Sequence, residues 1–383
     1  MTTRSLPRLP LAVALAGLVA LALVGVGCRR LAKPEGWASP VLVPAGDGTS
    51  TLLVSHKDRL YSFDAATLEV HWAFPTGQET EKVDVVALYG EPTTAGGTVF
   101  VPGYDDYLYA INAENGALRR NWPFPTGDVL VGGVTAGEDR VYFGSSDGNV
   151  YAVNFDGTEA WSFKSAKRIW STPVLSMGKL YVTSLDGNLY ALDAQSGDEL
   201  WKYKTGAGIA GPPVVDESLG LIYLGGFDNK LRGIDMGTHK ERWEIKADNW
   251  FWTRPLLANG VVYAGSLDGR VYAVDAATGD PAWPAPFETL AEIHSAPVLV
   301  GDVLLIIDRD GNVYGISAAD GTPAFQKPLA LAEDVLTDPV VRPASAGASD
   351  QQLEMIVVTK AGSLIVIDPV ELKVVERKPL SGD

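Results

Sequence analysis

Cysteine and basic residues are scarce in this sequence, and each shortage excludes a class of protein. Cys28 is the single cysteine among 383 residues, so disulfides cannot stabilise the fold. The 31 lysines and arginines are outnumbered by 47 aspartates and glutamates, which gives a formal net charge of −16. Nucleic-acid binding needs a basic surface that neutralises phosphates, so this charge argues against a nucleic-acid partner. It argues equally against docking of the folded body on anionic lipid.

Recognisable catalytic and metal-binding motifs are also missing. None of the histidines has a metal-ligand spacing such as HExxH; they are His56, His71, His239 and His294. The string Asp308-Arg309-Asp310-Gly311 has only part of the ligand set of a calcium loop. Paired glycines such as Gly132-Gly133 do not open helices, so a phosphate-binding loop is not expected. We therefore predict a protein that is not an enzyme and needs no cofactor.

One long apolar run is present, at the N-terminus. Arg4 and Arg8 precede the stretch Leu11–Gly27, a pattern that predicts a signal peptide over residues 1–27. Val26, Gly27 and Cys28 resemble the lipobox of bacterial lipoproteins, although Gly25 replaces the usual leucine. The resemblance implies lipidation at Cys28, with residues 28–37 as a tether. An uncleaved membrane anchor and plain secretion are the alternatives, and all three place the body outside the cytoplasm.

A unit of about forty residues recurs along the rest of the chain. The cleanest copies have a hydrophobic strand, an Asp-Gly turn, a strand such as Leu-Tyr-Ala-Leu-Asp, a glycine turn and then a tryptophan, and four of the eight copies have degenerate turns in place of Asp-Gly. Glycine in the Asp-Gly turn readily takes the positive φ that a hairpin needs. Counting copies predicts eight four-stranded blades over residues 38–383, with seven blades as the alternative. An all-β propeller results, because stacking the sheets in a ring buries both faces of each.

The tryptophan of each unit is predicted to pack one blade against the next. The series comprises Trp72, Trp122, Trp161, Trp201, Trp243 and Trp283, with Phe325 in the seventh unit. No exchange of strands between the first and last blades is evident in the sequence. Residues 29–37 could add an outer strand to the last blade.

The strings LYALDAQSGDELW and VYAVDAATGDPAW resemble the pyrroloquinoline-quinone (PQQ) type of propeller repeat, and the resemblance covers about residues 38–379. One group with this repeat, the quinoprotein alcohol dehydrogenases, holds PQQ and calcium at the centre of eight blades. This chain lacks their vicinal cysteine pair. The other group comprises propeller lipoproteins of the outer-membrane β-barrel assembly machinery, which this chain resembles in length, lipobox and minimal blades. That resemblance implies a lipid-anchored scaffold, monomeric within a complex, that binds an envelope protein such as a β-barrel assembly component.

A candidate binding surface follows from aligning the residue three positions before the proline of each first strand. Four of these eight positions are aromatic and one is histidine, and loops of this kind surround one mouth of a propeller. Leu130, Ile209 and Leu336 complete the alignment. The predicted rim comprises Trp37, Tyr89, Arg168, Trp170, Trp250, Phe251, Trp252, Arg254 and His294. It would bind an extended peptide or a sugar, or it would instead plug the channel.

Two other functions stay open on the sequence alone. A PQQ- and calcium-dependent dehydrogenase would need ligands that we cannot identify here. A propeller that recognises cell-wall sugars or peptides would use the same aromatic rim.

Overall fold

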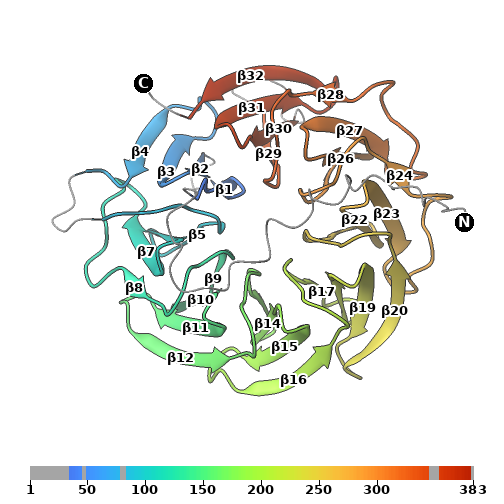
Figure 1. Ribbon diagram of the computed structural model, residues 1–383. Helices are drawn as coiled ribbons and strands as arrows, with labels where there is room; N and C mark the ends of the chain where they lie inside the picture. Colours follow the sequence, from blue (N-terminus) through green and yellow to red (C-terminus); the bar gives the residue numbers. More distant parts are fainter. Residues whose placement is uncertain (1–33, 45–48, 78–82, 345–352, 381–383) are drawn as a thin grey trace, which may run out of the picture. The chain divides into compact units, whose positions relative to one another are not determined.

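The computed structural model describes residues 34–44, 49–77, 83–344 and 353–380. Within these residues 32 strands form eight four-stranded antiparallel sheets, arranged as blades around an axis (Figure 1). This confirms the eight-bladed propeller and excludes seven blades. Cys28 and the expected signal peptide lie outside the described residues. No helix in the described part of the chain is long and apolar enough to cross a membrane.

Each blade is built from four consecutive strands, and the first strand of each lies nearest the axis (Figure 1). The first strands are β1 (Val41–Pro44), β5 (Thr93–Ala95), β9 (Val134–Ala136), β13 (Val174–Ser176), β17 (Val214–Asp216), β21 (Leu256–Ala258), β25 (Val298–Val300) and β29 (Val340–Pro343). The second strands are β2 (Ser50–His56), β6 (Thr98–Pro102), β10 (Arg140–Gly144), β14 (Lys179–Thr183), β18 (Leu221–Gly225), β22 (Val261–Gly265), β26 (Val303–Ile307) and β30 (Leu353–Val358).

The third and outer strands complete the blades. The third strands are β3 (Arg59–Asp64), β7 (Tyr107–Asn112), β11 (Asn149–Asn154), β15 (Asn188–Asp193), β19 (Lys230–Asp235), β23 (Arg270–Asp275), β27 (Asn312–Ser317) and β31 (Ser363–Asp368). The outer strands are β4 (Val70–Phe74), β8 (Phe124–Pro125), β12 (Glu159–Lys164), β16 (Glu199–Lys204), β20 (Lys240–Lys246), β24 (Phe287–Glu288), β28 (Leu329–Ala330) and β32 (Lys373–Pro379). Second and third strands are the most buried, since neighbouring blades cover both their faces.

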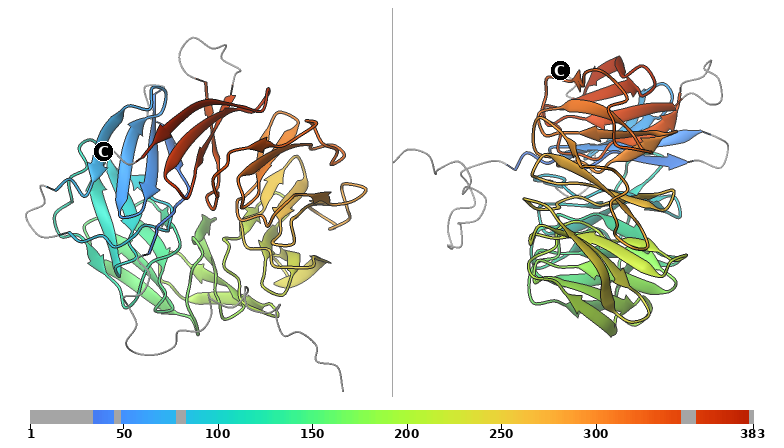
Figure 2. Two further views of the ribbon diagram at one scale, coloured as in Figure 1. Left: turned by 45° about the horizontal axis from the view of Figure 1, so that its top comes forward. Right: turned by 90° about the vertical axis from the view of Figure 1, so that its right-hand side faces the viewer.

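The ring has two unlike faces, seen edge-on in the right-hand view of Figure 2. One face carries the linkers that run from each blade to the first strand of the next, together with the turns between second and third strands. We call it the linker face. The opposite face carries the first-to-second and third-to-outer turns. The Asp-Gly turns lie on the linker face, and Gly148 has the expected positive φ of 88° within a turn longer than a two-residue hairpin.

Blades pack on one another through tryptophan and glycine. The Trp161 indole Nε1 donates to the Ala194 carbonyl of the next blade at 3.1 Å, and Trp243 does the same to Ala276 at 3.0 Å. A methyl group added at Gly197 would lie 2.6 Å from the Trp161 ring. The glycine of the third-to-outer turn is therefore required twice, by its positive φ and by the ring against it. The structural role predicted for these tryptophans is confirmed.

The fourth blade departs from this pattern. Trp201 is only half-buried, and His239 takes the place of the glycine in the following blade. The His239 ring stacks on the Trp201 indole with centroids 4.6 Å apart and planes inclined by 15°. Ring stacking thus replaces the glycine contact at this boundary.

The boundary between blades 8 and 1, which we call the closing seam, has no shared strand. An apolar cluster spans it, with Leu52, Val54 and Phe63 from blade 1 against residues such as Ile356 and Val366 from blade 8. The Lys378 ammonium, over the Phe63 ring, donates to the Leu68 carbonyl. Trp37 forms a β-bridge with His56 of blade 1, so this residue does not extend the outer edge of blade 8.

Three outer strands are only two residues long: β8, β24 and β28. Proline interrupts each of the corresponding sequences, as at Pro284 and Pro286 beside β24. Proline cannot donate a backbone hydrogen bond, so pairing with the third strand stops early. The other outer strands run for five to seven residues.

Candidate functional site

The linker face is held together by backbone hydrogen bonds. The Leu185 N–H donates to the Arg168 carbonyl at 3.0 Å, and the Phe227 N–H donates to the Gly208 carbonyl at 2.9 Å. Equivalent bonds join the second-to-third turn of nearly every blade to its own linker, for example from Leu267 to Trp250. The side chains of these turns and linkers are therefore held at fixed places around the face.

The aspartates of the second-to-third turns also hold each turn against its linker. The Asp147 carboxylate accepts the Tyr151 hydroxyl at 2.7 Å and the Gly127 N–H of the incoming linker at 2.9 Å. Burial alone would raise the pKa of Asp147, but these hydrogen bonds outweigh it and lower the pKa. Burial and the same carboxylate raise the pKa of Tyr151 to about 12. Asp186 and Asp268 repeat the arrangement, which accounts for the turn aspartates as structural residues.

Each of the seven linkers contains a buried apolar residue whose N–H donates to a carbonyl in the second-to-third turn of the preceding blade, and we call this residue the wedge. The wedges are Leu88, Leu130, Ile169, Ile209, Phe251, Ile293 and Val335. The Ile169 side chain rests directly on Gly144 at the end of the preceding blade's second strand, and Phe251 rests in the same way on Gly225. Phe251 is 1% exposed, so its predicted place on the rim is wrong. It fills the position that isoleucine fills in other linkers and packs against Tyr272.

The residue after the wedge is only partly buried in six of the seven linkers; Ala210 is the buried exception. Trp37, which follows Gly36, takes the corresponding place in blade 1, and the series continues with Tyr89, Val131, Trp170, Ala210, Trp252, His294 and Leu336. Leu130 and Ile209 were aligned one place too early, because blades 3 and 5 have no single proline at the usual spacing. The aromatic members and His294 keep part of their surface exposed.

Blades 5 and 6 together present three stacked rings. Phe227 lies 4.5 Å from Trp250 and 5.4 Å from Trp252, measured between centroids, with interplanar angles of 24° and 15°. We call this set the Trp250–Trp252 stack. Each ring is partly exposed. Sequence reasoning missed Phe227; the signal was its position in the second-to-third turn, where blades 3, 4 and 6 have Ser146, Leu185 and Leu267.

A second aromatic cluster belongs to blades 1 and 2. Tyr89 makes edge contacts with Trp37 and with Tyr104, both with centroids 4.9 Å apart. Tyr104, which was also missed, occupies the same turn position in blade 2 as Phe227 in blade 5. The two clusters are offset by four blades in a ring of eight, so they lie on opposite sides of the axis.

The remaining predicted rim residues are polar or singly placed. Trp170 donates through Nε1 to the Ser146 hydroxyl at 3.1 Å, and Arg168 beside it is exposed. His294 lies 3.1 Å from the Glu292 carboxylate, which Arg309 approaches to 3.7 Å. The rim is therefore two aromatic clusters with charged residues between them, and not one continuous aromatic ring.

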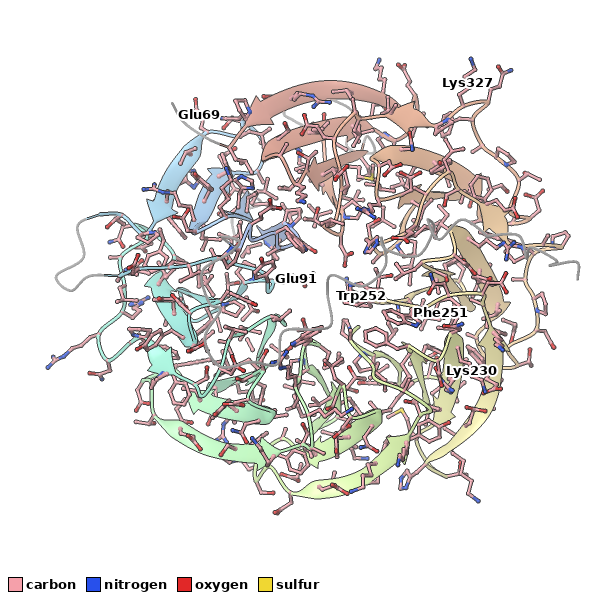
Figure 3. All side chains as sticks on the ribbon, in the orientation of Figure 1. Glu69, Glu91, Lys230, Phe251, Trp252 and Lys327 are labelled. Atoms are coloured by element: carbon pink, nitrogen blue, oxygen red, sulfur yellow. The ribbon has the colours of Figure 1, made fainter. Side chains whose placement is uncertain are left out.

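Three charged residues, Glu91, Arg254 and Asp338, each stand one position before a first-strand proline and interact with one another near the axis. Glu91 of blade 2 and Trp252 of blade 6 face the centre from opposite sides (Figure 3). Burial raises the pKa of Glu91, and the nearby Asp338 carboxylate raises it further, against the charge of Arg254 and a hydrogen bond with Ser39. Burial likewise raises the pKa of Asp338, against the Ala296 N–H that it accepts at 2.6 Å.

These carboxylates do not fit a metal centre. Calcium takes about six to eight oxygen ligands. The part of the chain that the structure describes contains no group of three or more His, Cys, Asp or Glu residues placed to hold a metal ion. Glu91 and Asp338 instead accept hydrogen bonds from neighbouring blades, which makes them part of the ring's inner wall.

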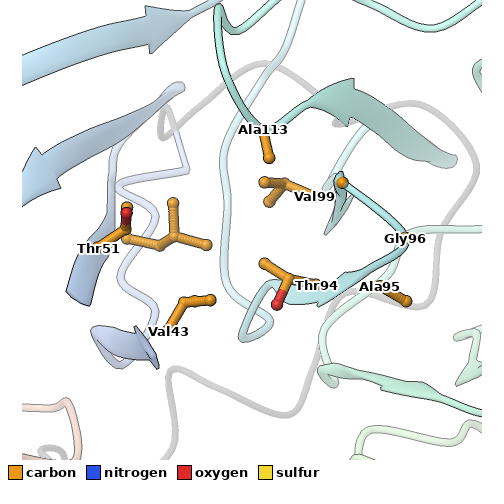
Figure 4. A pocket seen from close by; sticks show the side chains of 9 residues that line it. Val43, Thr51, Thr94, Ala95, Gly96, Val99 and Ala113 are labelled. Atoms are coloured by element: carbon orange, nitrogen blue, oxygen red, sulfur yellow. The ribbon is translucent and has the colours of Figure 1, made fainter. Parts of the chain in front are cut away.

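A small pocket lies on the opposite face, between blades 1 and 2 (Figure 4). Its volume is about 280 Å³, and Val43, Leu53 and Val99 are among its apolar lining residues. Gly96 and Gly97 form its edge, where the first-to-second turn has no side chain. The pocket carries no charged side chain and is remote from the rim.

Comparison with known proteins agrees with this architecture. The sequence model of the family described as outer membrane protein assembly factor BamB matches residues 29–154, 119–238 and 208–382. The chain belongs to this family. Outer membrane protein assembly factor BamB of Burkholderia pseudomallei is 26% identical over 216 residues, which is 52% of this chain and 55% of that protein. The match thus spans about half the length of this curated relative.

Two further relatives bear on the fold and on the alternative function. The crystal structure of BamB from Moraxella catarrhalis superposes with a TM-score of 0.69 at 17% identity, covering 85% of this chain and 95% of that one. At such identity the likeness shows the fold alone. Quinohemoprotein alcohol dehydrogenase ADH-IIG of Pseudomonas putida is 32% identical over 147 residues, but these are 32% of this chain and 20% of that enzyme.

Proposed function

We propose that this chain is a non-catalytic, lipid-anchored propeller that takes part in outer-membrane protein assembly by binding a partner protein. Membership of the BamB family across residues 29–382 carries the proposal. The relatives' names place them in outer-membrane protein assembly, and the proposed role follows theirs. Lipidation at Cys28 would hold the protein at the membrane, outside the cytoplasm.

The partner would bind on the linker face, through the Trp250–Trp252 stack and the Trp37–Tyr89–Tyr104 cluster. Aromatic rings and arginine are favoured at the centres of protein interfaces because they bury large area with little loss of side-chain freedom. Here the rings are already stacked on one another, so binding would cost little further ordering. The exposed Arg168 and Arg254 would supply charged hydrogen bonds beside them.

The test is capture of the partner from native envelope membranes by full-length protein, with the captured proteins identified by mass spectrometry. We expect wild-type protein to enrich a β-barrel assembly protein, and the double variant Trp250→Ala, Trp252→Ala to lose it. Trp201→Ala is the matched control, since Trp201 is a half-exposed tryptophan on an outer strand away from this face. Thermal unfolding of each variant measures whether the fold persists.

Three results would contradict the proposal. Loss of partner with Trp201→Ala but not with the double variant would move the binding surface to the blade edges. Unfolding of the double variant would show that the stack plugs the ring. Capture of no assembly protein by wild-type protein would remove the assembly role itself.

A further inference from the structure

We infer that the pocket between blades 1 and 2 binds a small neutral phenol, that is, an aromatic ring that carries one hydroxyl group. The repeat itself supplies the model for this ligand, because other blades fill the corresponding space with a tyrosine of their own. The pocket lies on the face opposite the rim. The inference therefore goes beyond the proposed role in outer-membrane protein assembly and does not depend on it.

Tyrosine stands at one position of the second strand in blades 3 to 6. The four residues, each at most 4% exposed, are Tyr142, Tyr181, Tyr223 and Tyr263. Register defines the position, since Tyr142 pairs with the third-strand residue that itself pairs with Trp161 of the outer strand. In blade 1 Leu53 holds the same place relative to Trp72. Leu53 is therefore the blade 1 counterpart of these tyrosines.

The tyrosine ring fills the space between one blade and the next. Tyr142 belongs to an apolar cluster with Leu175 and Leu180 of blade 4. Its hydroxyl donates to the Ala194 carbonyl of blade 4 at 3.0 Å, and this carbonyl also accepts the Trp161 Nε1–H at 3.1 Å. A carbonyl oxygen has two lone pairs, so it can accept both donors.

The boundary between blades 6 and 7 repeats this arrangement. Tyr263 shares an apolar cluster with Leu299 and Leu304 of blade 7, and its hydroxyl donates to the Ala318 carbonyl at 3.3 Å. That carbonyl also accepts the Trp283 Nε1–H, at 3.0 Å. At both boundaries the repeat thus combines a buried phenol ring with a carbonyl that accepts its hydroxyl.

Three smaller side chains leave this space open between blades 1 and 2. Leu53 replaces the tyrosine. Thr94 and Val99 of blade 2 replace the two leucines, because they pair with each other as Leu175 pairs with Leu180 in blade 4. All three smaller residues line the pocket, whose volume is about 280 Å³. The pocket is therefore the place that a tyrosine ring takes at other boundaries.

The pocket has the size and the lining of a site for one substituted ring. Figure 4 shows Val43 and Thr51 on the blade 1 side and Thr94 and Val99 on the blade 2 side. An apolar cavity of about 150 Å³ holds benzene, so about 280 Å³ leaves room for a ring with substituents. The described lining residues include no charged side chain, so a charged ligand would lose its hydration without gaining a charged partner.

The Ala113 carbonyl is the acceptor that corresponds to those of Ala194 and Ala318. It accepts the Trp72 Nε1–H at 2.8 Å, which is the only hydrogen bond that the described residues make to it. A ring placed like that of Tyr142 would bring its hydroxyl to the other lone pair of this oxygen. The pocket therefore favours a phenol over a plain aromatic hydrocarbon.

The test compares two probes. Para-cresol is the tyrosine side chain without its backbone, and toluene is the same ring without the hydroxyl group. Each is titrated into the full-length protein, and the amide signals of the lining residues Gly96, Gly97 and Ala113 are followed by NMR spectroscopy. We expect saturable shifts of these signals at millimolar para-cresol, and binding several-fold tighter than that of toluene. Absence of such shifts overturns the inference, and equal affinity for toluene overturns the assignment of a phenol.

The repeat also supplies the variants. Leu53→Tyr places the ring of the other blades in the pocket and should abolish para-cresol binding, with a urea midpoint at least as high as that of wild type. Thr94→Leu restores the leucine of the other blades, narrows the pocket and should weaken binding several-fold. Thr135→Leu is the matched control, because it makes the same change on the first strand of blade 3, away from the pocket, and should leave binding unchanged.

Two results with these variants contradict the inference. Leu53→Tyr that binds para-cresol as wild type does would overturn it. If Leu53→Tyr does not fold, Thr94→Leu decides, and equal binding by Thr94→Leu and Thr135→Leu would overturn it as well. Neither a membrane nor a partner protein is present in these titrations, so their outcome is independent of the assembly role.

Discussion

A linker of the chain crosses seven of the eight boundaries between neighbouring blades, and none crosses the closing seam. The two kinds of boundary are held together by different contacts. At each crossed boundary the wedge N–H donates to a carbonyl of the preceding blade's turn, from Leu88 to Lys57 at 2.8 Å through to Val335 to Arg309 at 3.0 Å. At the closing seam, the described residues show the Glu35–Lys360 ion pair in that place. His56 is packed there against Gly362. A covalent linker makes blade contact local in sequence, whereas the closing seam must form between residues about 300 positions apart.

Glycine-to-alanine variants should show the largest difference in unfolding free energy between a crossed boundary and the closing seam. Gly178→Ala meets only the cost of a positive φ, since nothing lies near its added methyl group, and should lower the free energy of unfolding by about 1 kcal/mol. Gly197→Ala adds a clash with the Trp161 ring and should cost about 3 kcal/mol. Gly362→Ala, 2.6 Å from the His56 ring, should fall between them, because the closing seam can widen without straining a linker.

Urea unfolding midpoints of the three variants give the order. If Gly362→Ala lowers the free energy of unfolding more than Gly197→Ala does, the closing seam is at least as rigid as a blade boundary that a linker crosses. Equal costs for Gly178→Ala and Gly197→Ala would remove the packing role of the Trp161 ring.

A titratable residue distinguishes the closing seam in a second way. Burial lowers the pKa of His56 below 6.5, with Lys57 acting in the same direction and Asp58 against it. The unfolded chain then takes up this proton at a higher pH than the folded chain. Stability from His56 is therefore complete above pH 6.5 and is lost as the pH falls below it.

We expect the His56→Gln variant to lose less stability than wild type between neutral and mildly acidic pH. His239→Gln is the control, since His239 is exposed and lies at a crossed boundary. Urea midpoints over that pH range measure both. Parallel pH profiles for wild type and His56→Gln would show that other groups carry the acid sensitivity.

The ion pair at the closing seam should have the smallest effect. Lys360 and Glu35 are 37% and 58% exposed, and pairs in that setting contribute about 0–1 kcal/mol. Lys360→Ala should therefore change the unfolding free energy by less than about 1 kcal/mol, and less still at high salt. A double-mutant cycle with Glu35→Ala isolates the coupling. A coupling well above that value would mean that this pair, and not the apolar cluster, closes the ring.

The repeat made the fold predictable, because turn glycines, tryptophans and strand alternation recur at the same offsets in most units. Phe325 and Trp283 were assigned correctly for this reason, since each position is supported by its copies. The site was harder, because it consists of the places where the copies differ. Phe251 was misplaced since three adjacent aromatic residues at 250–252 give no indication of which one is the wedge. Only the contact with Gly225 decides it.

Phe227 and Tyr104 were missed for a related reason. Each stands at a turn position where other blades have serine, leucine or a basic residue. Tyr104 meets Tyr89, and Phe227 meets Trp250 and Trp252, all in the linker that enters the same blade or the next. Ring stacking between a turn and a linker depends on the angle between them, which one sequence does not contain. The sequence also did not predict how the ring closes, because nothing in it indicates that Lys378 and Leu68 are in contact.

The short outer strands leave this ring with two kinds of perimeter. In blades 2, 6 and 7 the prolines shorten the outer strand to two residues, so few backbone N–H and C=O groups are left there for an extended external chain to pair with. Blades 3, 4 and 5 present three neighbouring strands of six or seven residues with open edges, and charged side chains at intervals along them. Pairing of an external strand with the edge of this ring is therefore confined to blades 3 to 5 and to blades 8 and 1. The rest of the perimeter, around blades 2, 6 and 7, offers almost no open strand edge for such pairing.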